Sequence, residues 1–363
     1  MRPEALAAML PYLTEQYGNP SGSHAVARRA RDGVEEAREV VARHLGCAPG
    51  EVVFTSGGTE ACNLALLGVH DAVGGEVRCS AFEHHAVLDC CASLGAEIVP
   101  VGAGGTIDLD ALAAALHPGV RLVSVMLVNN EVGTIQPVAE AVQLVRELAP
   151  DAIFHTDAVA AGAWLDLADA AVGAGADLVS VGAHKFGGPK GAGALVVRDG
   201  VRLGKVLYGG AQERERRPGT HNVAGIVGMA VALDVAVRLR EEETKAVRAR
   251  RDRLAEGLLE GVAGLTVTAP RTPKLPGTCH VRIEGADQEE LLLLLDEEGV
   301  RASGGSACAS GATEPSHVLL AMGLGRAEAR QAVRFSLGWN TTEEDVDLAL
   351  AAVPKSVERL RRS

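Results

Sequence analysis

The feature that most constrains this chain is the alternation of short apolar runs with amphipathic ones over its first two-thirds. The apolar runs have the length and composition of buried strands, and helical patterns lie between them. This order predicts an α/β fold with a mostly parallel sheet covered by helices. The predicted strands are residues 51–55, 76–80, 97–101, 121–128, 152–157 and 178–182, and the predicted helices include 3–10, 59–67, 86–94, 109–116 and 138–148.

The last third has a different order. A long helical pattern with an Arg- and Glu-rich middle is typical of a solvated bridge between domains, and a smaller α+β region follows it. Because 363 residues are enough for two domains, we expect a large domain over 1–235 and a small one over 236–363. The predicted elements are a helix at 222–262, strands at 265–268, 279–283 and 333–337, and helices at 287–298 and from 342 onward.

Composition excludes several classes of protein. The formal net charge of −12 argues against binding polyanions, because nucleic-acid affinity rests mostly on neutralising phosphates. No run approaches the roughly eighteen apolar residues of a membrane helix, and the N-terminus lacks the order of a signal peptide. Seven cysteines without CxxC spacing indicate a reducing compartment and no zinc site. We therefore expect a cytoplasmic protein that binds no metal, membrane or nucleic acid directly.

Two side chains at predicted strand ends suggest a cofactor. Lys185 follows the strand 178–182 and precedes a Gly- and Pro-rich turn, where a flexible amine suits a Schiff-base lysine. Taken alone, Lys185 would be a surface lysine at a turn. Asp157 ends the preceding predicted strand. An acid that pairs with a pyridinium nitrogen, beside such a lysine, is the pattern of a pyridoxal phosphate (PLP) site.

Two strand-to-helix junctions carry further candidates. At residues 56–60 (Ser-Gly-Gly-Thr-Glu), small side chains let backbone N–H groups approach an anion, although a capped turn has the same pattern. His84 lies at the next such junction, where it would either cap the helix or cover a cofactor ring and move protons.

Polar residues stand out at two more places. Asn129 and Asn130 follow the predicted strand 121–128, as cofactor contacts or as an Asx turn. Six of the seven cysteines lie in apolar or helical settings and are predicted to be small core residues. Cys308 lies instead in a run of Gly, Ser and Ala, where an accessible thiol on a mobile loop can act as a nucleophile.

Several separated motifs occur in one order along nearly the whole chain. They are Gly18-Asn19-Pro20-Ser21, Phe54-Thr55-Ser56-Gly57, Glu83-His84, Asn129-Asn130-Glu131, His155-Thr156-Asp157-Ala158, residues 181–191 around Lys185, Arg217-Pro218-Gly219-Thr220, the Cys308 loop with Glu314-Pro315-Ser316, and Arg334-Phe335-Ser336-Leu337-Gly338. With these motifs the chain resembles a cysteine desulfurase of the NifS/IscS type, in the class V group of fold-type I PLP enzymes. The Cys308 loop is the part that separates desulfurases from their class V relatives.

The resemblance implies how the cofactor would be held. Lys185 would form the Schiff base, Asp157 would pair with the pyridine nitrogen, and His84 would stack on the ring as a catalytic residue. The remaining implied contacts are Gly58, Thr59 and His184 on the phosphate, Thr220 on the phosphate of the partner subunit in a homodimer, and Asn130 near the phenolic oxygen.

The resemblance also implies the substrate contacts. Asn19 and Arg334 would bind L-cysteine, with Arg334 on its carboxylate, and Cys308 would attack its sulfur.

Three departures from the family pattern stand out. Ala160 and Gly182 replace a glutamine and a serine, and each lost hydrogen bond costs roughly 1 kcal/mol, so we expect weaker PLP affinity rather than none. The family's short N-terminal segment has no counterpart before Met1. We therefore expect either an upstream start or a form that binds PLP and turns over cysteine poorly.

Three hypotheses about function follow. The leading one is conversion of L-cysteine to L-alanine, with the sulfur passed to Cys308 as a persulfide for iron–sulfur cluster or tRNA thiolation pathways. The second is a selenocysteine lyase or another class V PLP lyase or aminotransferase. The third is a degenerate, non-catalytic subunit of a sulfur-transfer complex. The sulfur acceptor itself is not predicted by the sequence.

Overall fold

The computed structural model describes residues 1–305 and 315–362, which form two compact units. The first unit comprises residues 1–99, 107–128 and 136–240, and the second comprises 100–106, 129–135 and 241–363. Each unit therefore contains more than one stretch of chain. Within the described residues, no helix is both long and apolar enough to span a membrane.

The first unit contains a seven-stranded sheet in the order β1-β7-β6-β5-β4-β2-β3. Only β7 runs antiparallel to its neighbours, β1 and β6, and the other pairs are parallel. The predicted α/β class with a mostly parallel sheet is confirmed. The strands are β1 (Val52–Thr55), β2 (Glu76–Ser80), β3 (Glu97–Val99), β4 (Val120–Ser124), β5 (Ile153–Asp157), β6 (Leu178–Gly182) and β7 (Gly193–Val197).

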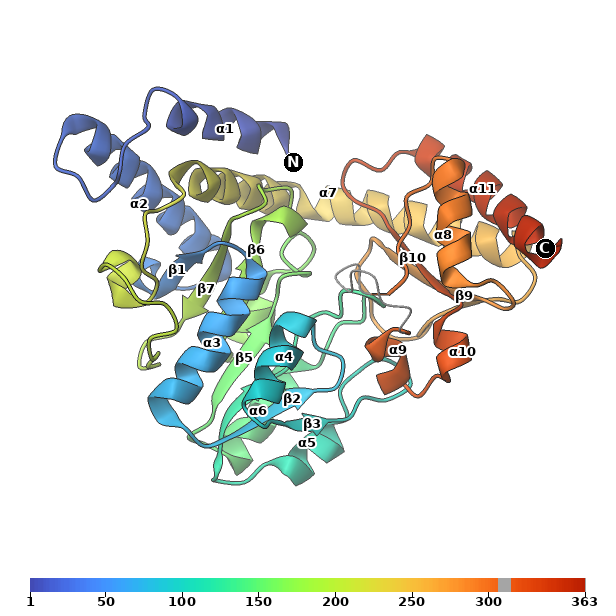
Figure 1. Ribbon diagram of the computed structural model, residues 1–363, viewed down its shortest axis with the longest axis horizontal. Helices are drawn as coiled ribbons and strands as arrows, with labels where there is room; N and C mark the ends of the chain where they lie inside the picture. Colours follow the sequence, from blue (N-terminus) through green and yellow to red (C-terminus); the bar gives the residue numbers. More distant parts are fainter. Residues whose placement is uncertain (306–314, 363) are drawn as a thin grey trace. The chain divides into compact units, whose positions relative to one another are not determined.

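Helices cover this sheet because their apolar faces match its buried side chains. Helix α3 packs against β4, β5, β6 and β7 and lies beside α4, as Figure 1 shows in blue and cyan. Its buried residues join one apolar cluster with side chains of the sheet strands. The helices that begin in this unit are α1 (Pro3–Leu13), α2 (Ala25–Leu45), α3 (Gly58–Val73), α4 (His85–Ser93), α5 (Leu109–Ala115), α6 (Val138–Leu148) and α7 (Val223–Gly261).

The second unit is built on a small antiparallel sheet in the order β10-β9-β8. Helices α8 and α11 pack against each other, and α8 also contacts β10. The elements are β8 (Leu265–Val267), β9 (Thr278–Ile283), α8 (Gln288–Glu297), α9 (His317–Ala321), α10 (Arg326–Ala329), β10 (Ala332–Ser336) and α11 (Glu343–Arg362).

The structure corrects the prediction of one strand over residues 121–128. Strand β4 ends at Ser124, although the backbone N–H groups of Val125 and Leu127 still donate to carbonyls of β5. The apolar run is buried, but its regular ladder stops halfway. Strand β7 and helix α2 were not among the predicted elements. The start of β7 is glycine because a Cβ at Gly193 would lie 2.7 Å from the backbone of Gly57.

A buried ion pair holds a strained segment of the first unit. Glu213, Arg214 and Glu215 all have positive φ angles of 48°, 56° and 65°, a region that non-glycine residues rarely occupy. The Glu213 carboxylate accepts two hydrogen bonds from Arg38, at 2.7 and 2.8 Å, and one from the backbone N–H of Phe54 at 2.8 Å. Strain of this kind persists only where the surroundings hold it, so these bonds stabilise the segment.

We predict that Glu213→Gln destabilises the fold above pH 5. Burial alone would raise the pKa of Glu213, but hydrogen bonds from Arg38, His221 and Phe54 and the Arg38 charge lower it to about 2. A lowered folded-state pKa stabilises the fold above the ordinary glutamate pKa, and this stability is lost as the pH falls toward 2. At pH 7 we expect a loss of roughly 3 kcal/mol in the free energy of unfolding, measured by denaturant titration.

The matched control for this prediction is Glu215→Gln, which changes an exposed acid on the same strained segment. It should leave the free energy of unfolding within about 0.5 kcal/mol of the wild type. A Glu213→Gln deficit that stays constant from pH 7 down to pH 3 would contradict the proposed origin of the stability.

Candidate functional site

Lys185 lies where the sequence predicts it, just beyond the carboxyl end of β6. Strand β6 ends at Gly182, and one 3-10 turn carries Lys185 at an exposed position beside the buried Phe186. Gly187 then adopts φ 87°, which turns the chain away from the sheet. The sequence around Lys185 therefore presents an accessible amine on a short, well-supported turn.

The N-terminus secures this turn. Arg2 is only 2% exposed, its backbone N–H donates to the carbonyl of Gly187 at 2.7 Å, and its Nε donates to the carbonyl of Phe186 at 3.2 Å. A Cβ on Gly187 would lie 2.6 Å from Cγ of Arg2, so the arginine stem fills the space above this glycine.

Asp157 ends β5, the strand next to β6, and is 6% exposed. Burial raises the pKa of the Asp157 carboxyl. The backbone N–H of Val159, the charge of His84, the Cys62 thiol and the charge of Lys185 lower it in part. Val159 N donates to Oδ1 at 2.9 Å. Because Lys185 follows the end of β6, the strand next to β5, the fold places these two predicted residues at neighbouring strand ends, and the charge of His84 also lowers the pKa of Asp157.

His84 caps helix α4, which was one of the two roles considered for it. Its Nδ1 accepts a hydrogen bond from the backbone N–H of Ala86 at 3.1 Å. In the neutral ring the proton therefore sits on Nε2. The cap orients the ring without using Nε2, so the capping role and the cofactor role are compatible.

Glu83, beside His84, is a site residue for which no role was predicted. It is fully buried and accepts hydrogen bonds of 2.6 Å from the Ser80 hydroxyl and from the backbone N–H of Met126. Burial raises its pKa to about 8. Glu83 thereby fixes the β2–α4 turn that carries His84. The signal for this role was an acid directly after a buried apolar strand.

Two glycines, Gly57 and Gly58, form the start of α3 and expose backbone N–H groups there; we call this place the cradle. The helix begins at Gly58, and its N-cap, Gly57, makes no side-chain cap. A Cβ on Gly58 would lie 2.5 Å from Val159, and a Cβ on Gly182 would lie 3.5 Å from the Gly58 N–H nitrogen and 3.4 Å from His184 Nδ1. Backbone N–H groups at a helix N-terminus attract anions, so this cradle fits a phosphate group.

His184 lies beside this cradle as a neutral group. Burial lowers its pKa, and the charges of Lys185, Lys190 and His84 lower it further. His184 is therefore a neutral donor or acceptor near neutral pH, in an environment that several cationic groups share.

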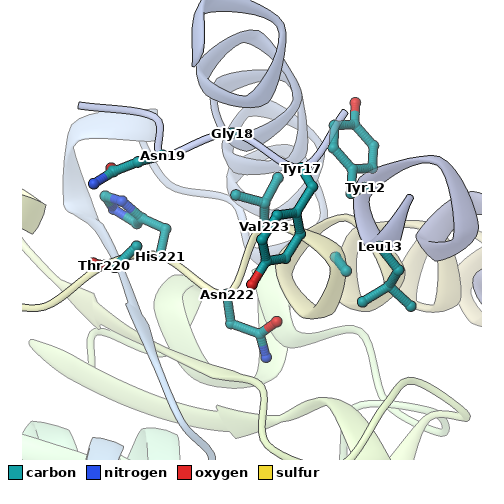
Figure 2. A pocket seen from close by; sticks show the side chains of 10 residues that line it. Tyr12, Leu13, Tyr17, Gly18, Asn19, Thr220, His221, Asn222 and Val223 are labelled. Carbon is teal, nitrogen blue, oxygen red and sulfur yellow. The ribbon is translucent and has the colours of Figure 1, made fainter. Parts of the chain in front are cut away.

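Thr220 and Asn19 line one cavity of the first unit. Figure 2 shows the cavity, about 380 Å³ in volume, with Tyr12 and Tyr17 on its walls. The loop before Thr220 is held at the first turn of α3, because Arg217 donates to both carboxylate oxygens of Glu60 at 2.6 and 3.1 Å. Asn19 and Thr220 are thus brought together.

Arg334 and Asn130 meet in the second unit. Arg334 lies on β10, and its Nη1 donates to the backbone carbonyl of Asn130 at 2.6 Å, while its Nη2 donates to the Ser303 hydroxyl at 2.8 Å. These bonds hold the guanidinium in one orientation. The neighbouring Asn129 forms an Asx turn, because its Oδ1 accepts from the N–H groups of Glu131 and Val132. The local-turn alternative is therefore confirmed for Asn129.

The segment that carries Cys308 begins and ends at this same place. Residues 306–314, including Cys308, lie outside the described residues. On one side, Ser303 is paired with Arg334, and on the other, the Ser316 hydroxyl donates to Glu131 at 2.5 Å. A Cβ on Gly305 would lie 3.1 Å from Ser316, so the two ends are adjacent.

Of the six cysteines predicted to be core residues, all but Cys47 are confirmed as buried. Among the described cysteines five are buried, and Cys47 is half-buried. Burial raises the pKa of Cys47 to about 12 and those of Cys90 and Cys279 to about 11. Thiols with such pKa values are poor nucleophiles near neutral pH.

Comparisons with known proteins agree with this geometry. The family model described as Aminotransferase class-V matches residues 1–349. The chain is 40% identical to "Cysteine desulfurase IscS" of Dictyoglomus turgidum, covering 99% of this chain and 93% of that protein. It is 43% identical to "IscS-like cysteine desulfurase" of Mycobacterium tuberculosis, covering 100% and 95%. A solved structure titled "NIFS-LIKE PROTEIN" superposes with a TM-score of 0.91 at 34% identity, covering 100% and 97%.

We predict that Arg2→Ala loosens the turn after Lys185. The variant removes one hydrogen bond to a buried carbonyl and the packing over Gly187, so we expect a loss of roughly 1–3 kcal/mol in the free energy of unfolding. Thermal unfolding would measure it, with Arg29→Ala as the control because Arg29 is exposed. Equal melting temperatures for the two variants would show that Arg2 does not secure the turn.

Proposed function

Because the chain belongs to the class-V aminotransferase family, we propose that it is a cysteine desulfurase that converts L-cysteine to L-alanine and retains the sulfur as a persulfide. The observation that carries the proposal is the cluster of Lys185, Asp157 and His84 beside the open N-terminus of α3. The curated relatives named as cysteine desulfurases support the substrate, and they do not favour a selenocysteine lyase, another class V reaction or a non-catalytic subunit.

The class-V aminotransferases are PLP enzymes, and the residues of this site fit that cofactor. An accessible lysine follows β6, a buried acid ends the adjacent β5, and the backbone N–H groups at the start of α3 approach Gly182 at the end of β6. In our proposal Lys185 binds the cofactor covalently, Asp157 holds its pyridine nitrogen, and His84 lies on its ring. When bound, the cofactor withdraws electrons from the substrate Cα. The proposed phosphate contacts are Gly58, Thr59, His184 and, from the partner subunit, Thr220, with Asn130 toward the phenolic oxygen.

In this proposal, some residues of the chain bind the substrate and others transfer protons. Arg334, held by Asn130 and Ser303, presents its guanidinium to the substrate carboxylate, with Asn19 as a second substrate contact. With the cofactor bound, the Lys185 amine would take the proton from Cα. His84 carries a proton on Nε2, since Nδ1 is occupied by the Ala86 N–H.

Cys308 would carry out the sulfur transfer. Its thiolate attacks the substrate sulfur, a new S–S bond forms, and the Cβ–S bond of the substrate breaks. The electron pair left on the substrate Cβ would take up a proton and Lys185 would return the proton to Cα, which yields alanine and a Cys308 persulfide. The described residues on either side support this role, because Ser303 binds Arg334 and Gly305 lies close to Ser316.

An exposed apolar stripe supports a homodimer. Leu6, Leu10 and Leu13 of α1 follow each other at helical spacing and are 46%, 51% and 53% exposed, and Tyr17 is 80% exposed. Tyr17 and Leu13 also line the cavity that contains Thr220. Contiguous apolar patches of this kind mark interaction surfaces, and in our proposal a second copy of the chain covers this one.

Three further assignments remain proposals. Residues 1–235 would be the PLP-binding domain and 236–363 the smaller domain that carries Cys308. The sulfur would go to an acceptor protein in iron–sulfur cluster or tRNA thiolation pathways. The protein would act in the cytoplasm.

We predict that Cys308→Ala reduces alanine and sulfide release from L-cysteine by more than about a hundredfold, as expected when a covalent nucleophile is removed. The wild type should also gain the mass of one sulfur atom on Cys308 after a single turnover. Cys47→Ala is the control, because the thiol of Cys47 is half-buried with a raised pKa. Wild-type rates in Cys308→Ala would refute the mechanism. Turnover of selenocysteine alone by that variant would identify the lyase alternative.

We predict that Gly182→Ser strengthens PLP binding about three- to tenfold, since one added hydrogen bond contributes roughly 1 kcal/mol. Gly182 has φ −132° and ψ 123°, which any residue adopts, and its Cβ would lie 3.3–3.5 Å from Val159, His184 and Gly58. Cofactor titration of the apoprotein would measure the dissociation constant. Gly182→Ala adds the Cβ without the hydroxyl, so an equal gain in both variants would exclude the hydrogen bond as the cause.

A further inference from the structure

His221 combines an anchored ring with a buried nitrogen that the described part of the chain does not use. It follows Thr220 directly and lines the same cavity of the first unit as Thr220 and Asn19. In the view of Figure 2, its ring lies between these two side chains. His221 Nε2 lies 2.7 Å from Oε1 of Glu213, whereas Nδ1 is buried without a hydrogen-bond partner among the described residues. A buried polar atom of this kind is unfavourable, so Nδ1 needs a further hydrogen-bonding group.

The Glu213 carboxylate fixes the orientation of this ring. Glu213 accepts hydrogen bonds of 2.7 and 2.8 Å from Arg38 and one of 2.8 Å from the backbone N–H of Phe54, so it is itself held firmly. Burial raises the pKa of this carboxyl, but its hydrogen bonds and the Arg38 charge lower it to about 2. Glu213 therefore only accepts, His221 Nε2 is the donor, and Nδ1 is the nitrogen left for another group.

A second histidine with a carboxylate partner uses both of its nitrogens. His117 Nε2 lies 3.2 Å from Oε2 of Glu76, and its Nδ1 accepts from the backbone N–H of Gly119 at 3.1 Å. The His117 ring is exposed and needs no further group. A carboxylate beside a histidine is thus no sign of a ligand by itself. The unused Nδ1 in the wall of a cavity distinguishes His221.

A phosphate group has the chemistry that this nitrogen needs. Nδ1 accepts a hydrogen bond in the neutral ring and donates one when it carries a second proton, and Nε2 donates to Glu213 in both forms. A phosphate monoester has its second pKa at about 6, so near neutral pH its oxygens can carry one proton or none. The hydrogen bond then holds one proton between Nδ1 and a phosphate oxygen, whichever of the two supplied it.

The loop holds Thr220 and His221 in place for such a group. On one side of Thr220, the Gly219 N–H donates to Oε1 of Gln212 at 3.0 Å, and on the other side Glu213 fixes His221. Gly219 has φ 112°, a conformation that favours glycine. Because the residues on both sides of Thr220 are anchored, binding has to order little of the loop.

We propose that His221 is a phosphate-binding residue: held by Glu213, its Nδ1 contacts the same cofactor phosphate as Thr220. This inference rests on the proposed function and adds a contact to it. Gly182 offers that phosphate no hydroxyl, and a contact from His221 would offset the loss.

The first experiment titrates each apoprotein with PLP and with pyridoxal, which lacks the phosphate, and follows the visible absorption of the bound cofactor. His221→Gln keeps an N–H donor for Glu213 and removes Nδ1. It should bind PLP about tenfold more weakly, the effect of losing one hydrogen bond to a charged group, and bind pyridoxal within about twofold of the wild type. The control His117→Gln should bind both compounds like the wild type.

Two results of these titrations would overturn the inference. Wild-type affinity for PLP in His221→Gln would show that His221 only anchors the loop through Glu213. An equal loss for PLP and pyridoxal would show a general defect of the loop rather than a lost phosphate contact.

The second experiment needs no cofactor. Inorganic phosphate at about ten times its measured dissociation constant should raise the melting temperature of the wild-type apoprotein by on the order of 1–2 °C. The increase should be smaller in His221→Gln and unchanged in His117→Gln. Equal increases in all three proteins, or none in any of them, would refute the phosphate contact.

The two experiments separate the two proposals. Failure of the wild type to bind PLP would refute the proposed function, while the melting temperatures with inorganic phosphate still decide whether His221 binds a phosphate group.

Discussion

One constraint underlies the proposed site: a buried carboxyl group lies at the end of the strand next to the one that leads to an accessible amine. The parallel pairing of β5 and β6 places Asp157 at the end of one strand, and Lys185 follows the end of the other. Burial works against the charge of Asp157, so its surroundings supply the Val159 N–H, the Cys62 thiol and the charges of His84 and Lys185. At the start of α3, the space beside Gly57 is open within 4 Å and leaves room for an anion.

Elsewhere in the same unit, ion pairs stabilise a loop with an unfavourable backbone conformation. Three consecutive left-handed residues precede the loop that carries Thr220, and the Glu213–Arg38 pair holds them in place. Arg217 fixes the same loop to Glu60 at the start of α3, the helix whose N-terminus forms the cradle. Strain and ion pairing are therefore coupled here: the loop adopts an unfavourable backbone because buried charges compensate for it.

Local patterns were enough to predict most of the elements and to select the central residues of the proposed site. The runs at 76–80, 138–148 and 178–182 became β2, α6 and β6 with the predicted bounds. Asp157, Lys185 and His84 were selected because each lies at the end of a strand or the start of a helix. The charges of His84 and Lys185 both lower the pKa of Asp157. The predictions were wrong or missing where distant contacts decide. Strand β4 stops at Ser124 despite an apolar run to Val128, and β7 depends on the close approach of Gly193 to Gly57.

By itself, the sequence determined the α/β class, the order of the elements and the strand ends at which chemistry is possible. These depend on periodicity and on residue types that are near one another in the chain. Only the tertiary structure decided that His84 caps a helix through Nδ1 and that Glu213 binds Arg38. Such pairs lie far apart in sequence or depend on one side-chain rotamer, and burial then changes their hydrogen bonds and pKa values. No local pattern carries that information.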